Sequence, residues 1–133
     1  MGIEEIEGIG PAYGAKLEAA GIRSAAALLK AGATRADRKA LADQTGISTD
    51  KILEWVNHAD LMRIDGVGSQ YADLLEAAGV DSPAELGQRN AKNLAQTFQE
   101  LDAARNTVAR IPSEAMVAGW ITQAKGLAKV VEH

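Results

Sequence analysis

The chain has 133 residues, a net charge of −4 at pH 7 and no cysteine. Without cysteine it can have no disulfides, thiolate metal sites or cysteine nucleophiles. No apolar run approaches the ~18–20 residues of a membrane span, and the acidic start lacks the basic and apolar segments of a signal peptide. These features predict a cytoplasmic protein. The 26 alanines and 12 leucines, against only five aromatic residues, predict an all-α fold.

The sequence contains an internal repeat. Residues 6–22 and 64–80 share nine identities over 17 positions at an offset of 58. Further along, the offset becomes 65, so the second copy holds about seven extra residues, which we place around 101–108. We therefore expect two tandem pseudo-repeats, 1–62 and 63–133, packed together as one unit.

Each copy is predicted to be a series of short helices separated by capping residues. The first helix begins near Pro11, which suits a first helical turn, and runs to Ala20 with Gly21 as its cap. Later helices are expected to begin after residues whose side-chain oxygens can cap a helix. These residues are Ser24, Thr34, Ser48, Ser82, Asn90 and Ser113.

A pair of glycines precedes the first long helix of each copy. We name Gly8-Ile9-Gly10 hairpin 1 and Gly66-Val67-Gly68 hairpin 2. Paired glycines tolerate the positive φ that a sharp reversal needs. We therefore expect Gly10→Val and Gly68→Val to destabilise the fold, because a β-branched residue accepts positive φ only at a high cost.

An apolar-Gly-apolar-Gly turn followed by a small residue four positions on is similar to the helix-hairpin-helix motif. Hairpin 1 with Gly14 and hairpin 2 with Ala72 both fit this pattern. Fainter hairpins follow at 45–48 and 110–113. Two hairpins per copy resemble the compact unit of tandem helix-hairpin-helix domains, such as the amino-terminal domain of RecA-like recombinases. Residues 59–86, the segment from Asn90 to Leu94 and the stretch from Trp120 to Lys125 carry a second resemblance. Over almost its full length, the chain is similar to a bacterial helix-hairpin-helix repeat family that is described only as a domain of unknown function.

The helix-hairpin-helix resemblance implies that hairpin N–H groups can meet nucleic-acid phosphates, in some members with a bound monovalent cation. Charge argues against this at the two hairpins. Residues 1–22 carry one lysine against four glutamates, and 60–85 carry one arginine against six carboxylates. Phosphate binding depends strongly on basic side chains. Basic residues lie instead at 23–39 and 89–129, so any nucleic-acid contacts are expected at Arg35, Arg38, Lys39, Arg105 and Arg110. The alternative is that these residues form solvated helix faces.

No catalytic or metal-binding constellation is evident. Neither His58 nor His133 has a second ligand at a metal-binding spacing, and no nucleophile–base arrangement or phosphate-binding loop is present. Tyr13 and Tyr71 are expected to be packing residues, with Trp55 and Trp120 as core anchors. We therefore expect a non-catalytic interaction module without cofactor or small-molecule substrate, serving protein–protein contact or self-association. The alternative is weak, sequence-non-specific binding to DNA or RNA.

Overall fold

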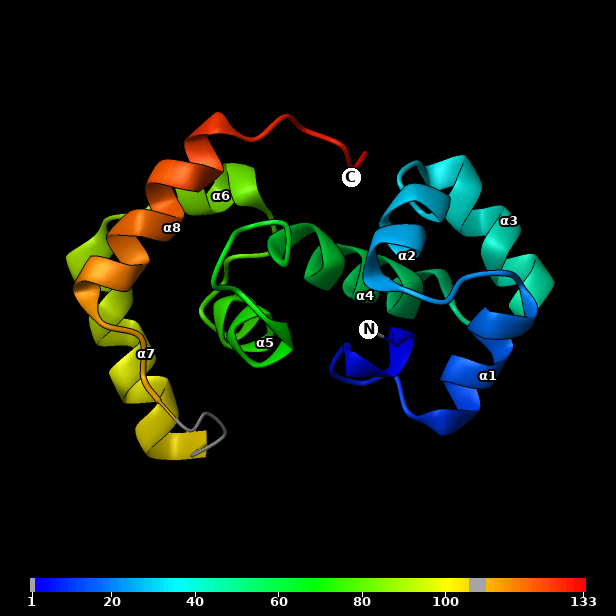
Figure 1. Cartoon of the computed structure of the whole chain (residues 1–133), viewed down its shortest axis with the longest axis horizontal. Helices are drawn as coiled ribbons and strands as arrows, with labels where there is room; N and C mark the ends of the chain where they lie inside the picture. Colours follow the sequence, from blue (N-terminus) through cyan, green and yellow to red (C-terminus); the bar gives the residue numbers. More distant parts are fainter. Residues whose placement is uncertain (1, 106–109) are drawn as a thin grey trace. The chain divides into compact units, whose positions relative to one another are not determined.

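The computed structural model describes residues 2–105 and 110–133, and within them the protein is all-helical with no strand. Figure 1 shows the elements in chain order. They are the short 3-10 helix η1 (Ile3–Glu5) and the α-helices α1 (Pro11–Ala19), α2 (Ala25–Ala31), α3 (Arg35–Thr45), α4 (Thr49–Leu61), α5 (Ser69–Ala77), α6 (Pro83–Gly87), α7 (Ala91–Arg105) and α8 (Glu114–Gly126).

The predicted capping residues precede the helices as expected. Each has a side-chain oxygen that accepts a hydrogen bond from the backbone N–H three residues later, which satisfies a donor that the first helical turn leaves open. The donor–acceptor distances are 3.0–3.3 Å. The capping residues are Ser24, Thr34, Ser48, Ser82, Asn90 and Ser113.

The chain divides into two compact units. Unit 1 comprises Met1–Asp60 together with Val130–His133, and unit 2 comprises Leu61–Lys129. The division falls two residues before the boundary expected from the sequence. The last four residues were expected to belong to the second copy, but they pack in unit 1, and we call them the strap. The strap joins unit 1 because Val131 is buried there, with 1% of its surface exposed, and Glu132 pairs with the backbone of Ala33.

Unit 1 holds η1 and helices α1 to α4 around an aliphatic core. Its buried residues come from every element, with Ile3, Leu17, Leu28 and Ile52 fully covered. Buried Gly32 ends α2 where space is short, because a Cβ there would lie 2.6 Å from a methyl group of Val56 on α4. The first hairpin is preceded only by the three-residue η1, so the helix before it is shorter than the motif predicts.

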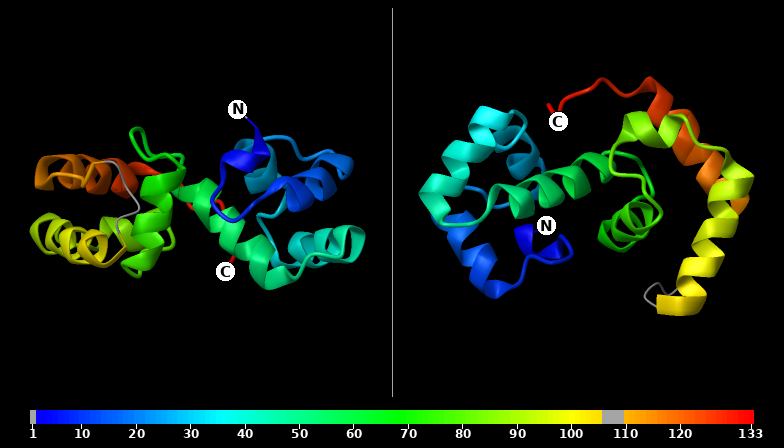
Figure 2. Two further views of the ribbon diagram at one scale, coloured as in Figure 1. Left: turned by 90° about the horizontal axis from the view of Figure 1, so that it is seen from below. Right: turned by 180° about the vertical axis from the view of Figure 1, so that it is seen from behind.

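Unit 2 holds α5 to α8, and Figure 2 gives two further views of these helices. Helix α8 packs against both α6 and α7, and Phe98 and Trp120 are the large aromatic members of the core. Helix α7 has 15 residues, whereas α3 has 11. Part of the extra length predicted around 101–108 is therefore helical, and the rest lies outside the described residues.

The prediction that the second glycine of each hairpin needs positive φ is wrong. The first glycine has this conformation, with φ +89° at Gly8 and +91° at Gly66. Gly10 and Gly68 have φ of −85° and −93°, which any residue adopts, and a Cβ at either would have no atom within 4 Å. Space and backbone conformation therefore both permit a side chain at the second glycine.

Candidate functional site

The two glycine hairpins have the same local geometry. The N–H of Ile9 donates to the carbonyl of Ile6 at 3.0 Å, and the N–H of Val67 donates to the carbonyl of Ile64 at 3.0 Å. All four of these aliphatic side chains are buried. The middle residue of each hairpin is thus a core residue, and only the flanking glycines face solvent.

A tryptophan from the last long helix of each unit lies under its hairpin. A Cβ at Gly8 would lie 3.3 Å from Nε1 of Trp55, and one at Gly66 would lie 3.2 Å from Nε1 of Trp120. Trp55 and Trp120 are 2% and 3% exposed, as expected for core anchors.

Each tryptophan also packs against a tyrosine from the helix that follows its hairpin. The ring centroids of Tyr13 and Trp55 are 5.1 Å apart, and those of Tyr71 and Trp120 are 5.3 Å apart. Tilted pairs at this distance add to the stability gained by burial. The tyrosines are therefore packing residues, as predicted.

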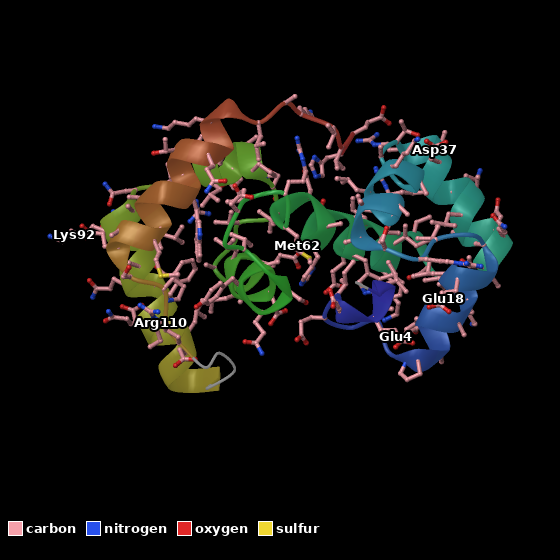
Figure 3. All side chains as sticks on the ribbon, viewed as in Figure 1. Glu4, Glu18, Asp37, Met62, Lys92 and Arg110 are labelled. Atoms are coloured by element: carbon pink, nitrogen blue, oxygen red, sulfur yellow. The ribbon has the colours of Figure 1, made fainter. Side chains whose placement is uncertain are left out.

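Each hairpin leads directly into a helix N-terminus. Gly10 and Gly68 are the N-caps of α1 and α5, and neither helix has a side-chain cap bond. A helix N-terminus favours anions. Near hairpin 1, however, Glu4, Glu5 and Glu7 are exposed; Figure 3 labels Glu4 together with Glu18 of α1.

The predicted nucleic-acid contacts have different surroundings. Lys39 and Arg110 are exposed, and Figure 3 labels Arg110; its backbone carbonyl accepts a hydrogen bond from Tyr71 at 2.9 Å. Arg105 ends α7, and its side chain lies outside the described residues. Arg38 is only 4% exposed, so the expectation of a solvated side chain is wrong for this residue.

The Arg38 guanidinium binds backbone carbonyls. It donates to the carbonyls of Gly32 at 2.8 Å and Ala33 at 3.2 Å, just after the last turn of α2, and to the carbonyl of Glu132 in the strap. Cations are favourable at a helix C-terminus, where carbonyls lack partners. Burial lowers the pKa of Arg38 below its ordinary value, and nearby Glu132 opposes this effect.

The strap lies in a site that we name the strap groove, made by Ala33 and Arg35 with the buried residues Arg38 and Asn57. The N–H of Glu132 donates to the carbonyl of Ala33 at 2.7 Å. The carboxylate of Glu132 accepts the N–H of Arg35, the first residue of α3, at 3.2 Å. Figure 1 shows the end of the chain beside α2.

Two further bonds hold the last residue of the strap. Nε of Arg35 donates to the carbonyl of His133, and Nε2 of His133 pairs with Oδ1 of Asn57 at 3.0 Å. Two of the five predicted nucleic-acid contacts, Arg35 and Arg38, therefore bind a segment of the protein itself. A phosphate would have to compete with the strap for both side chains.

Comparison with known families identifies the chain. A family model described as Domain of unknown function (DUF4332) matches residues 7–127. The chain belongs to this family. Both hairpins and all residues of the strap groove lie within the match to the DUF4332 model, whereas the strap lies beyond it. No curated protein and no solved structure matches the chain.

The described residues form neither a metal site nor a membrane-spanning helix. In 2–105 and 110–133, no three His, Asp or Glu side chains are grouped so that they could hold a metal ion. Over the same residues, no helix has the length and apolar character that crossing a membrane requires.

The sequence patterns did not predict the strap or the role of Asn57. A signal for the strap was present in the aliphatic pair Val130-Val131, which follows the end of α8 and belongs to no helical repeat. The repeat also held a signal that Arg38 occupies a buried position. Arg38 lies four residues after the N-cap Thr34, and the equivalent residue in the second repeat, four residues after the N-cap Asn90, is the buried Leu94.

Proposed function

We propose that this protein is a non-catalytic module, built of two helix-hairpin-helix pseudo-repeats, that binds protein segments, including those of its own kind. The repeat interpretation is supported by matching geometry at equivalent positions. The φ values of Gly8 and Gly66 agree within 2°, as do those of Gly21 and Gly79. The Tyr–Trp pair also recurs, with centroid distances that agree within 0.2 Å.

The observation that carries the proposal is the way in which the strap groove binds the strap. Unit 1 holds an extended segment that lies 94 or more residues away along the chain from its partners Arg35 and Arg38. The contacts are one backbone–backbone hydrogen bond, two guanidinium bonds to strap carbonyls, one carboxylate on a helix N-terminus, one bond between the side chains of His133 and Asn57, and one buried aliphatic side chain. Main-chain bonds with side-chain anchoring are a recurring mode of peptide recognition.

The charge around hairpin 1 supports protein binding over nucleic-acid binding. Each phosphate contact gains strength from a basic side chain and from counterion release. Three exposed glutamates, Glu4, Glu5 and Glu7, surround this turn, and Pro11 and Ala12 begin the helix that follows it. Hairpin 1 therefore lacks the basic side chains that would attract a phosphate, and its glutamates would repel one.

Weak, non-specific binding to DNA or RNA is the second candidate, favoured by one observation. The N-terminus of α5 has glycine as its N-cap and open space at Gly68. A phosphate oxygen could approach such backbone closely, aided by the exposed Arg110 of the same unit.

A nucleic-acid titration separates the two candidates. We expect no saturation by duplex or single-stranded DNA in the low micromolar range at ~20 mM salt, although non-specific binders reach about that range at physiological salt. Tight, salt-sensitive binding would contradict the proposal. Should binding occur, a larger loss with Lys39→Ala and Arg110→Ala than with Gly68→Ala would locate it on the basic side chains, and the reverse order would locate it on hairpin 2.

Self-association is tested directly by light scattering. The mass of the full chain is measured from about 1 μM to 1 mM, the range of weak association. A mass that rises with concentration supports self-association as the mode of protein contact. A constant monomer mass throughout the range contradicts it.

A further inference from the structure

We infer that the strap groove of one chain accepts the strap of a second copy, so that two chains associate by exchanging straps. The inference rests on the proposed function and names its partner. In the structure the strap fills the groove of its own chain, and the same groups can act between chains.

The groove recognises a short pattern, an aliphatic residue followed by an acidic one. Val131 supplies the buried side chain, with 1% of its surface exposed. Glu132 supplies three contacts: its N–H on Ala33, its carbonyl on Arg38 and its carboxylate on the N–H of Arg35. None of these contacts depends on which chain carries the strap.

The connection to the strap favours exchange. Helix α8 ends at Gly126, and the residues between it and the strap, 127–129, are not helical. The carbonyl of Ala128 accepts a hydrogen bond from Arg63 at 3.0 Å, and the five residues beyond it, 129–133, reach about 17 Å when fully extended. Exchanging an identical element between two chains retains every contact of the strap, which makes it a low-cost route to a dimer.

The groove is a feature of unit 1. Its central donor, Arg38, is matched in unit 2 by buried Leu94, which cannot bind a carbonyl. One groove and one strap per chain can close into a pair with two-fold symmetry, in which each chain gives and receives one strap.

Cysteine cross-linking can detect the exchange, because the chain has no cysteine of its own. Ala33→Cys marks the groove, and Val130→Cys marks the strap at a residue that is 41% exposed. The doubly substituted chain, treated with a short bis-maleimide, is expected to form an internal link that reports the filled groove. Failure of this link would overturn the inference at its first step.

The two single-cysteine chains are then mixed at equal concentration, and the cross-linked heterodimer is measured. We expect its yield to exceed that of a control pair, Ala33→Cys with Thr122→Cys on the exposed face of α8, by about tenfold. We also expect Val131→Asp in the strap-bearing chain to abolish this excess, because it places a charge in the site of a buried aliphatic side chain. A yield equal to the control, or one that Val131→Asp leaves unchanged, would overturn strap exchange.

Light scattering keeps this inference separate from the proposed function. If the full chain self-associates and the Val131→Asp variant does so equally, strap exchange is wrong. The proposed function is then retained, with self-association through another surface. If neither associates and no heterodimer is trapped, self-association itself is wrong. Loss of association in Val131→Asp alone supports the inference.

Discussion

Replacing Gly66 by alanine is expected to destabilise unit 2 by about 2–3 kcal/mol, whereas the same change at Gly68 is expected to be nearly neutral. The two positions lie in one turn and differ by two residues. The comparison therefore separates backbone strain from a general sensitivity of the hairpin.

The expected cost at Gly66 has two parts. A side chain at its φ of +91° costs about 1–2 kcal/mol. The new Cβ would also lie 3.2 Å from Nε1 of Trp120, and this ring is 3% exposed and packed against Tyr71. Moving the ring disturbs the core, for which we add about 1 kcal/mol, the lower end of the range for overpacking.

Neither part applies at Gly68. Its φ of −93° is open to alanine, and a Cβ there meets nothing within 4 Å. Alanine is a poorer N-cap than glycine by up to about 1 kcal/mol. This loss is offset by about 0.4–1 kcal/mol from the reduced freedom of the unfolded chain.

Urea denaturation followed by circular dichroism gives the two free energies of unfolding, and the indole N–H signals in an NMR spectrum report which unit is affected. Gly8→Ala and Gly10→Ala form the equivalent pair in unit 1, with Trp55 in the place of Trp120. Equal losses at Gly66 and Gly68, or a larger loss at Gly68, would refute the reasoning.

Three further substitutions test other parts of the fold by the same measurement. Gly14→Ala is expected to stabilise unit 1 by up to about 1 kcal/mol, since the equivalent residue is Ala72 and only the flexible side chain of Glu4 must move; a loss would contradict this. Ser82→Ala is expected to cost about 1 kcal/mol, because α6 loses its N-cap bond, and an unchanged midpoint would show that the cap is dispensable. Tyr71→Phe removes only the bond to the carbonyl at residue 110 and is expected to cost about 0.5–1 kcal/mol; a larger cost would mean that the ring packing also changes.

The helix starts could be predicted because capping is local chemistry. A side-chain oxygen and an N–H three residues later belong to the same turn, so Ser24 or Ser113 signals its helix without knowledge of the rest of the chain. The choice of the positive-φ glycine could not be predicted in this way. Both glycines of a hairpin fit the pattern. The sequence also does not reveal that the first glycine of each pair lies against a tryptophan, Trp55 at Gly8 and Trp120 at Gly66, which are 47 and 54 residues further along the chain.

The strap groove was beyond prediction for a related reason. Its bonds join residues 76–98 positions apart, and the strap has no helical period from which a partner could be inferred. The charge of Arg38 also pointed to solvent, because arginine is seldom buried without partners. Its partners are backbone carbonyls, which do not appear in a pattern of side chains.

Two of the five basic residues of segment 23–39, Arg35 and Arg38, bind groups of the protein itself. A guanidinium that contacts phosphate must reach solvent, but Arg38 is buried and its donors face carbonyls. Arg35 is exposed, yet it holds His133 with its side chain and Glu132 with its backbone N–H. Both residues thus bind an acidic, extended piece of polypeptide. In unit 1 the guanidinium groups of Arg35 and Arg38, which could attract phosphate, bind peptide carbonyls, and the backbone N–H of Arg35 binds the carboxylate of Glu132.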